Sequence, residues 1–391
     1  MKVAIISTMN LPTPAVRGGA VETLTTYIVE ENEKKQKLDI DLYTIYDYKI
    51  NVDKYKSTKI IQIKINIIEK LFQKIMNCKN IILKKKPNYN ILYTKTVKLI
   101  TKQKYDKIII ENNMFVYDSI KDVVKTDLIY HMHNDFNGWD KTEENYRNIA
   151  KTASKILVVS QYIKNRVNNV EKTDKVEVLY NAIDTERYNC NDVINCREKY
   201  NINDDDIVIG YCGRIAKEKG ILELVKAIKK VNTKKNIKLL IVGSQWYDAL
   251  KEDRYMLELK KEIKEIEDKV IFTGFIQQEN MPSIYKMIDI LVIPSIVEEA
   301  FGCVAIEGMA METPLIVAKS GGLPEIVKKD YGDIIEKNSQ FIDNMAKSIE
   351  RLVENDKIRI EYGKNAKKEF DSNVNYHKDQ YFENFYKYIT E

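Results

Sequence analysis

The chain has 391 residues, of which 44% are hydrophobic and 31% are charged, a composition that excludes disordered, fibrous and membrane-embedded classes. Its length exceeds what one ordinary hydrophobic core holds, so we expect two domains. The net charge of +5 is unevenly spread: residues 1–180 contain 31 lysines and arginines against 21 acidic residues, whereas residues 181–391 contain 32 against 37. The first half is therefore expected to meet something anionic.

Secretion and disulfide stabilisation are not expected. The sequence has no run of about eighteen apolar residues, and prolines interrupt the first stretch before a secretory core could form. The five cysteines, at positions 78, 190, 196, 212 and 303, are odd in number and form no C-x-x-C pair. Such cysteines are typical of free thiols in a reducing compartment, which favours a cytoplasmic location.

The chain opens with the apolar run KVAIIST, which predicts a buried parallel strand. A loop with Gly18 and Gly19 follows, and then a helix that begins near Val21. A strand, a glycine-bearing loop and a helix allow backbone N–H groups to approach a phosphate, because glycine has no Cβ in the way. The runs DIDLYTIY and KIIQIKI predict the next two strands.

Residues 68–86 predict a basic amphipathic helix. Its apolar residues recur at helical spacing while its lysines lie elsewhere, and the stretch from Lys54 to Lys104 holds 14 lysines and one acid, Glu69. One interpretation is the solvated face of an ordinary helix. The other is docking on an anionic membrane surface, where each lysine contributes about 1 kcal/mol.

The runs KYDKIIIEN and DLIYHMHND predict two further strands, and the second ends in His131 and His133. These histidines share one face of an alternating strand, as a metal-binding pair would. No cluster of cysteine or acidic residues stands at ligand spacing beside them, so we expect no metal site there. KILVVS, QYIKNRV and KVEVLYNAID continue the strand and helix pattern to the end of the first domain near residue 184.

The second domain begins after a polar, unpatterned stretch near residues 184–200. The strand DIVIGYCG leads to Arg214, and Lys219 and Gly220 follow before a helix. Two cations five residues apart across a short loop can converge on one diphosphate, and such charge-assisted bonds contribute ~1.5–3 kcal/mol each. The alternative is an ordinary basic surface loop. KLLIVGS and KVIFTGFI predict the next two strands.

The stretch from Pro294 to Val327 combines two strands, ILVIP and PLIVA, with a helix over residues 302–311 between them. The free N–H groups at the start of this helix suit a phosphate, so Phe301, Gly302 and Cys303 are candidate ligand contacts. Two carboxylates, Glu299 and Glu307, lie just before and inside the helix. Carboxylates beside a phosphate site favour hydroxyl partners, and this combination indicates a nucleotide sugar.

These residues carry a specific resemblance. Glu299, seven residues, Glu307 and then the turn with Gly321, Gly322, Pro324 and Glu325 resemble the C-terminal signature of the retaining family 4 glycosyltransferases, the glycosyl transferases group 1, which have the GT-B fold. Arg214, Lys219 and Gly220 resemble the family's R-x-x-x-x-K-G element. One departure is Glu312, where the family usually has glycine. The stretch AVRGGAVET also resembles spore-coat-associated members.

The resemblance implies an α/β fold of two Rossmann-like domains that face each other across a cleft. It implies an acceptor-side domain over residues 1–184, a nucleotide-sugar-binding domain over 185–370 and a C-terminal helix over 371–391 that returns to the first domain.

The resemblance also implies the roles of individual residues. Arg214 and Lys219 would bind the donor diphosphate, Glu299 the sugar hydroxyls and Glu307 the ribose. His133 would contact the sugar or orient the acceptor, and Gly18 and Gly19 would lie near the donor diphosphate or the acceptor. Gly243, Ser244 and the segment 274–276 would lie near the base.

The expected activity is transfer of a sugar, with retention, from a nucleotide diphosphate sugar to a glycan, lipid-linked or cell-surface polymer acceptor. The resemblance implies a UDP-linked donor, because UDP is common in the family. No obligatory metal is expected, because no DxD pair occupies a suitable place. The protein would be cytoplasmic, with peripheral attachment to the inner face of the membrane as the second interpretation of residues 68–86.

Three other classes remain for comparison. A GT-B epimerase or phosphorylase would share the fold. A nonenzymatic basic protein that binds nucleic acid would explain the lysines but not Arg214, Lys219, Glu299 and Glu307. A nicotinamide dehydrogenase is disfavoured, since GYCGRI lacks the G-x-G-x-x-G spacing. We therefore expect no nucleic-acid partner.

Overall fold

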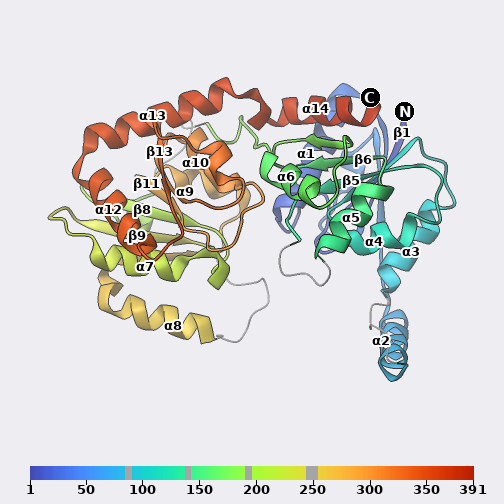
Figure 1. Ribbon diagram of the computed structural model, residues 1–391, viewed down its shortest axis with the longest axis horizontal. Helices are drawn as coiled ribbons and strands as arrows, with labels where there is room; N and C mark the ends of the chain where they lie inside the picture. Colours follow the sequence, from blue (N-terminus) through green and yellow to red (C-terminus); the bar gives the residue numbers. More distant parts are fainter. Residues whose placement is uncertain (84–89, 137–141, 190–195, 244–253) are drawn as a thin grey trace. The chain divides into compact units, whose positions relative to one another are not determined.

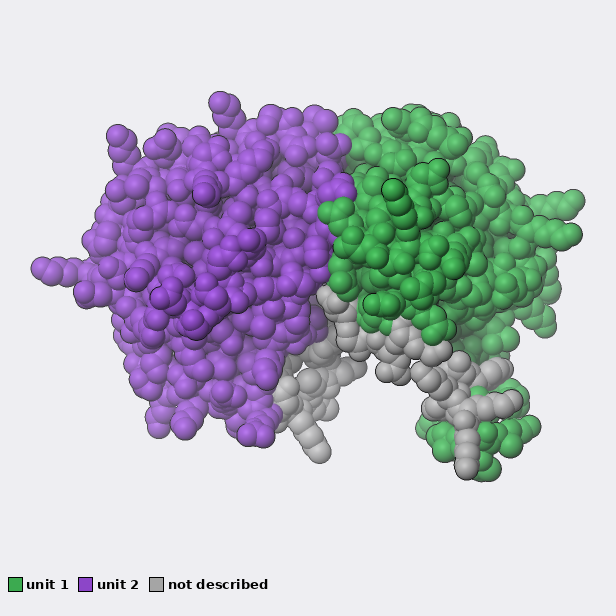
Figure 2. All heavy atoms as spheres, viewed as in Figure 1, with its two compact units in different colours: residues 1–159, 163–179, 378–391 green, residues 160–162, 180–377 purple. Residues whose placement is uncertain are grey.

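The computed structural model describes residues 1–83, 90–136, 142–189, 196–243 and 254–391 (Figure 1). These residues form two compact units, which Figure 2 distinguishes by colour. Unit 1 consists of Met1–Val159, Ile163–Leu179 and Lys378–Glu391, and unit 2 consists of Ser160–Tyr162 and Tyr180–His377.

Unit 1 is built on a seven-stranded parallel sheet with the strand order β3-β2-β1-β4-β5-β6-β7. The strands are β1 (Lys2–Ile6), β2 (Asp39–Ile45), β3 (Thr58–Ile63), β4 (Lys107–Glu111), β5 (Asp127–Met132), β6 (Lys155–Val158) and β7 (Val176–Val178). The helices are α1 (Ala20–Lys35), α2 (Ile67–Ile82), α3 (Ile91–Ile100), α4 (Met114–Ile120), α5 (Thr142–Thr152), α6 (Gln161–Val170) from Ile163 onward, and α14 (Lys378–Thr390). The central strands carry buried apolar runs, such as VAII in β1 and III in β4, because helices cover both faces of such a sheet.

Unit 2 has a six-stranded parallel sheet with the order β10-β9-β8-β11-β12-β13. Its strands are β8 (Ile207–Cys212), β9 (Ile237–Val242), β10 (Val270–Gly274), β11 (Ile290–Ile293), β12 (Leu315–Ala318) and β13 (Gly332–Ile335). Its helices are α7 (Ile221–Lys230), α8 (Arg254–Ile263), α9 (Met281–Tyr285), α10 (Cys303–Ala310), α11 (Leu323–Ile326), α12 (Phe341–Glu354) and α13 (Asp356–Ser372). In both sheets the strand order reverses beside the first strand of the unit, and ligands of open α/β sheets bind at such a switch point.

Short 3₁₀ helices connect several of these elements: η1 (Val52–Lys54), η2 (Glu198–Tyr200), η3 (Lys217–Lys219), η4 (Lys264–Lys269), η5 (Gln278–Asn280) and η6 (Val374–Tyr376).

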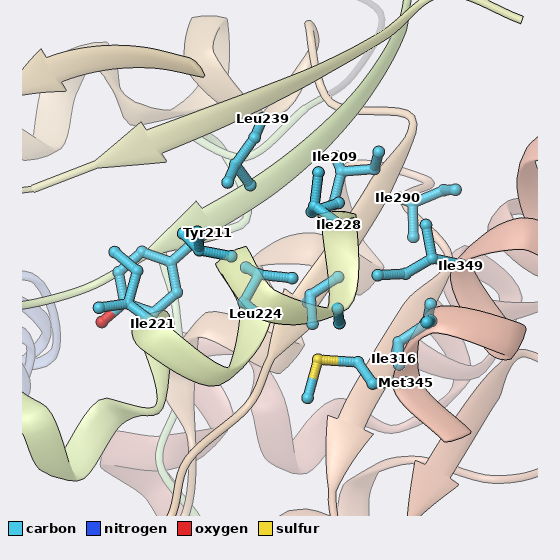
Figure 3. Close-up of a cluster of buried hydrophobic side chains, with 14 of the residues drawn as sticks. Ile209, Tyr211, Ile221, Leu224, Ile228, Leu239, Ile290, Ile316, Met345 and Ile349 are labelled. Carbon is cyan, nitrogen blue, oxygen red and sulfur yellow. The ribbon is translucent and has the colours of Figure 1, made fainter. Parts of the chain in front are cut away.

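Branched aliphatic side chains fill one face of the second sheet. Ile209 and Leu239 project from β8 and β9 toward Ile228 of α7, and Ile349 of α12 closes the same cluster (Figure 3). All four side chains are 2% exposed or less. This packing fixes the helix after β8, and with it the loop that carries the predicted cations.

The terminal helix α14 packs on α1 of unit 1. Glu383 lies 2.9 Å from the ammonium group of Lys35, and the Lys155 ammonium group donates to the Tyr388 carbonyl oxygen at 2.6 Å. Across the described residues, every helix is too short or too polar to cross a membrane.

Two residues after helix α10 ends, Glu312 has a left-handed conformation with a φ of 58°. The Thr313 N–H donates to the Gly308 carbonyl oxygen at 2.9 Å and closes the helix end. The turn thus keeps the geometry that favours glycine although the sequence supplies glutamate. A left-handed backbone costs an ordinary residue roughly 1–2 kcal/mol.

Replacing Glu312 with glycine is expected to raise the free energy of unfolding by about 0.5–1 kcal/mol. The relief of strain exceeds the entropy that glycine adds to the unfolded chain. Urea unfolding of the two proteins measures the difference. Glu361→Gly is the matched control, because Glu361 is exposed inside helix α13 and the same change there should cost about 1 kcal/mol. Equal destabilisation by both changes would contradict the inference that the left-handed backbone at Glu312 is strained.

Candidate active site

The loop after β8 carries both predicted cations, Arg214 at its start and Lys219 at its end. The Tyr211 hydroxyl donates to the Arg214 carbonyl oxygen at 2.6 Å and fixes the start of the loop. Gly220 ends the loop with a φ of 72°, and a Cβ there would lie 1.9 Å from the Pro294 carbonyl oxygen. Only glycine allows this approach, so the loop lies directly against the end of β11.

Lys219 and Glu299 form an ion pair at the carboxyl edge of the sheet. The Lys219 ammonium group lies 2.6 Å from Glu299 Oε1, and the Ser295 hydroxyl donates to the same oxygen. The side chains are 25% and 16% exposed, so water reaches the pair only in part. The guanidinium group of Arg214 lies 3.2 Å from Glu218 and is 42% exposed. The structure therefore brings Lys219 and Glu299 into contact and places Arg214 on the same loop.

The adjacent acids Glu298 and Glu299 have different surroundings. The Glu298 carboxylate accepts from the Gly321 N–H and lies 2.6 Å from the Lys337 ammonium group. Gly321 has a φ of 49°, and a Cβ there would lie 1.9 Å from the Glu299 carbonyl oxygen. The Gly322 N–H donates to that oxygen at 2.8 Å. Glu298 thus fastens the glycine turn, whereas Glu299 meets the lysine of the β8 loop.

Glu307 lies on α10 in a half-buried environment beside tyrosine hydroxyl groups. The Tyr285 hydroxyl donates to Glu307 Oε2 at 2.6 Å. Burial raises the pKa of Glu307 to about 7, although hydrogen bonds from Tyr285 and Tyr188 and the charge of Arg187 oppose the rise. Near neutral pH this carboxyl group can therefore change its charge when a ligand approaches.

The three residues at the start of α10 differ in what they offer a ligand. The Phe301 ring is buried against Tyr180 and Tyr376, with ring centroids 6.0 Å and 6.1 Å apart. The Asn181 amide donates to the Cys303 thiol at 3.4 Å, and burial raises the pKa of that thiol to about 12. Gly302 precedes the helix with a left-handed backbone. The side chains of Phe301 and Cys303 thus pack within the protein. The N–H groups at the start of α10 are therefore the groups that suit an anion.

Gly243 lies where the second strand of the unit ends. Its N–H donates to the Gly274 carbonyl oxygen at 3.0 Å, so the ends of β9 and β10 are joined. Ser244, the other candidate for the base, lies outside the described residues.

In unit 1, Gly18 and Gly19 precede α1, and Gly19 is the residue that caps the helix. The Thr8 hydroxyl, after β1, donates to the carboxyl group of Glu22 in the first turn of this helix. Burial raises the pKa of Glu22. A buried acid thus lies beside the glycine loop, where the sequence predicts a phosphate or acceptor contact.

His131 and His133 converge on Glu111, the last residue of β4. His133 Nε2 lies 2.7 Å from Glu111 Oε2, and His131 Nδ1 lies 2.9 Å from the same oxygen. The sequence shows no cysteine or acidic cluster at ligand spacing from these histidines, but the fold brings Glu111 to them, so the reason for expecting no metal site there is wrong. The three side chains form the group of described residues that could hold a metal ion. That no metal is obligatory for activity stays a prediction.

Sequence reasoning missed Glu111, Ser295 and Tyr285. The position of Glu111 at the end of the apolar run KIIIE was a usable signal, because parallel neighbours end at the same edge of a sheet. Ser295 lies two residues after the end of β11 and carried a similar signal. Tyr285 lies at the end of the short helix α9, and nothing in the pattern indicated that its hydroxyl meets Glu307.

Comparison with known proteins identifies one part of the chain directly. Residues 192–369 match the family of the glycosyl transferases group 1. The chain contains a domain of this family. The match includes Arg214, Lys219, Glu299 and Glu307 and confirms the resemblance that their spacing suggested.

Individual relatives agree with this assignment. The chain is 33% identical to the lipopolysaccharide 1,2-N-acetylglucosaminetransferase of Salmonella typhimurium over 58% of this chain and 58% of the relative, so it spans less than two thirds of that relative's length. It is 23% identical to spore coat protein SA of Bacillus subtilis over 97% of each chain. The structure is similar to Anabaena Alr3699/HepE in complex with UDP and glucose, with a TM-score of 0.77, 18% identity and coverage of 100% and 99% of the two chains. The likeness confirms the predicted GT-B fold.

The raised pKa of Glu307 predicts a pH-dependent stability. The folded-state pKa of about 7 exceeds the ordinary 4.5, so the folded protein favours the protonated form of Glu307. The contribution of this form to the free energy of unfolding is complete below about pH 4.5 and is lost as the pH rises through 7. The free energy of unfolding of the wild type, minus that of Glu307→Gln, should fall between about pH 5 and about pH 8 by on the order of 3 kcal/mol at most. Denaturant unfolding at several pH values measures it.

Tyr285→Phe provides the control for this measurement. Loss of the hydroxyl that donates to Glu307 removes a bond that favours the charged carboxylate, so the transition should move to higher pH. A difference between wild type and Glu307→Gln that stays constant with pH would refute the assignment.

Proposed function

We propose that the chain is a hexosyltransferase of polysaccharide biosynthesis. It transfers a sugar from a nucleotide diphosphate sugar to a hydroxyl group of a glycan, lipid-linked or cell-surface polymer acceptor, with retention at the anomeric carbon. The observation that carries this proposal is the contact at 2.6 Å between Lys219 and Glu299, with Arg214 on the same loop. It joins two motifs eighty residues apart in the chain at the strand edge where ligands bind.

The diphosphate of the donor would lie between Arg214 and Lys219. Their charges stabilise the negative charge that develops on the departing phosphate, at a place already prepared for it. When the phosphate takes the ammonium group of Lys219, the Glu299 carboxylate becomes available to accept hydrogen bonds from sugar hydroxyls. Two cations thus supply the positive charge for the leaving group, which is why no obligatory metal is part of the proposal.

In the reaction, the bond between the anomeric carbon and the phosphate oxygen breaks, and its electrons stay with the nucleotide diphosphate. The acceptor oxygen forms its new bond to carbon on the same face of the sugar. Its proton passes to an oxygen of the departing phosphate. No covalent nucleophile from the protein is required, and Arg214 and Lys219 act by charge alone.

The remaining predicted residues would position the donor and the acceptor. Glu307 would accept hydrogen bonds from ribose hydroxyls, and His133 would bond a sugar hydroxyl or orient the acceptor. Gly18 and Gly19 would lie near the donor diphosphate or the acceptor. In unit 2, backbone groups of Gly243, Phe301, Gly302 and Cys303 would contact the donor. The neighbour that binds UDP and glucose supports a UDP-linked donor, and the relative named for lipopolysaccharide supports a glycan or lipid-linked acceptor.

Lys219→Ala and Arg214→Ala are each expected to lower kcat/KM at least about 100-fold, since each removes a charge that stabilises the leaving phosphate. UDP, GDP and ADP sugars are first screened by thermal shift against the bare nucleotides, and turnover of the stabilising donor is then followed. Lys217→Ala is the matched control, because Lys217 is an exposed lysine of the same loop. Its rate should equal that of the wild type.

Wild-type rates in both variants would refute the assignment of the diphosphate site. The product also decides the reaction class. A glycoside is expected, whereas an isomerised nucleotide sugar or a sugar phosphate would indicate an epimerase or a phosphorylase.

We further propose that helix α2 holds the protein on the cytoplasmic face of an anionic membrane. None of its residues is buried, and an apolar row extends along it: Ile67, Ile68, Leu71, Phe72, Ile75, Ile81 and Ile82 are 47–85% exposed. Lys70, Lys74 and Lys79 are exposed on the same helix. Apolar surface with interleaved lysines suits a bilayer interface with negative headgroups. Residues 84–86 of the predicted stretch lie outside the described residues.

Vesicle sedimentation tests this attachment. The protein should bind vesicles that contain phosphatidylglycerol and lose binding in high salt, because each lysine contributes about 1 kcal/mol. Glu replacements at Lys70, Lys74 and Lys79 together should weaken binding at least about 100-fold. The control replaces Lys357, Lys364 and Lys368, three exposed lysines of α13, in the same way. Equal weakening by both sets would show that only net charge matters and would end the proposal for α2.

A further inference from the structure

Strand pairing brings Glu111 to the two histidines. In the register of β4 and β5, Glu111 lies opposite His131, and His133 follows two residues later on the same face. The side chains of Glu111 and His131 are 0% exposed and that of His133 is 2% exposed. The two imidazole rings have centroids 3.9 Å apart. This is a buried cluster of one acid and two bases at the carboxyl edge of the sheet.

A second contact fixes the backbone of His133. The Asn112 side-chain oxygen accepts from the N–H groups of His133 and Asn134, at 3.1 Å and 3.2 Å. Asn112 itself turns the chain after β4 with a φ of 50°, and its N–H donates to the His131 carbonyl oxygen at 2.8 Å. Residues 111 and 112 thus hold the ring and the main chain of His133 at once.

The position of the protons follows from these contacts. Burial alone would raise the pKa of Glu111, but the neighbouring His131 and His133 lower it to about 2, so the carboxylate is ionised and only accepts. The hydrogen in the 2.7 Å bond therefore belongs to His133 Nε2. Burial and repulsion from His131 lower the pKa of His133 to about 4, against the attraction of Glu111. A neutral imidazole carries one hydrogen, so Nδ1 of His133 is a bare acceptor.

This acceptor has no hydrogen-bond partner among the described residues, and it is buried. An unpaired buried acceptor costs roughly 1–3 kcal/mol. Such an atom beside the strand edge is suited to a donor that arrives with a ligand. A hydroxyl group is the donor that a sugar offers.

We propose that Glu111 is a positioning residue that holds His133 in the Nε2–H tautomer, so that Nδ1 accepts a hydrogen bond from one hydroxyl group of a bound sugar. The proposal rests on the proposed function and adds to it the residue that selects the tautomer and the ring nitrogen that meets the ligand. The same logic governs catalytic histidines elsewhere, where a carboxylate on one ring nitrogen decides what the other nitrogen does. His131 Nδ1 lies 2.9 Å from the same carboxylate oxygen.

Spectra of the protein labelled with ¹⁵N-histidine test the tautomer without any substrate. The chain has only three histidines, so His131→Asn and His377→Asn assign the signals. His133 in the wild type should carry its proton on Nε2. In Glu111→Gln the amide can donate as well as accept, so the proton should move in part to Nδ1. A wild-type His133 that is protonated on Nδ1, or on both nitrogens, overturns the proposal.

Turnover then tests the consequence. Glu111→Gln should lower kcat/KM about 100-fold or more, as the wrong tautomer does at other carboxylate–histidine pairs. If Glu111→Gln also slows hydrolysis of the donor in the absence of acceptor, the bonded hydroxyl group belongs to the donor sugar. If it slows only the transfer to acceptor, the hydroxyl group belongs to the acceptor. The matched control is Asp41→Asn, which changes another buried carboxylate of the same sheet, bonded to the Tyr105 hydroxyl at 2.6 Å. It should leave turnover unchanged even if it lowers Tm.

The remaining outcomes are distinct. A wild-type rate in Glu111→Gln with an altered tautomer overturns the proposal and leaves the proposed function intact. A wild type with the expected tautomer but no turnover of any nucleotide sugar overturns the proposed function instead. One bound transition metal per purified chain, lost in Glu111→Gln, would make the three side chains metal ligands and would also overturn the tautomer assignment.

Discussion

The ion pair between Lys219 and Glu299 is the contact on which the candidate site depends. A charge pair that is mostly removed from water persists only where its geometry is well fixed, because desolvation opposes the attraction. Two glycines allow that geometry, because neither has a Cβ atom. Gly220 lets the β8 loop touch the end of β11, and Gly321 lets the turn after β12 touch the backbone of Glu299. The ends of three strands thus meet at one point, and a single Cβ at either glycine would separate them.

The elements of the fold followed from the sequence because each parallel strand is a short apolar run bounded by polar residues. All the predicted strands are present, and the motif with Glu299 and Glu307 lies at strand ends as expected. Helices α3, α4, α8 and α9 were not predicted from the sequence.

Side-chain partners were less predictable. Glu298 and Glu299 are chemically identical neighbours, and only the loop geometry decides which of them meets Lys219. The partner of the histidines was hidden for a different reason. Glu111 is twenty residues away from His131 in the chain, and only the pairing of β4 with β5 makes them neighbours.

Glu111 and Glu307 show how the partner decides the state of a buried acid. Glu111 is fully buried and Glu307 is half-buried, and removal from water by itself raises the pKa of a carboxyl group. Glu111 faces imidazoles, and its pKa falls to about 2. Glu307 faces tyrosine hydroxyls, and its pKa rises to about 7. The first acid is therefore a fixed acceptor, whereas the second can bind a hydroxyl group in either protonation state.

The pair at Lys219 also bears on how a donor would be selected. Under the proposed function, a diphosphate that takes the ammonium group leaves Glu299 with the Ser295 hydroxyl and without its cation. A carboxylate in a partly buried site that loses its partner costs free energy until another donor replaces it. The sugar of a complete nucleotide sugar brings hydroxyl groups to that place, and a bare nucleotide does not. Recognition of the phosphate and of the sugar is thereby coupled through one carboxylate, so the unoccupied ion pair itself favours the intact donor over its product.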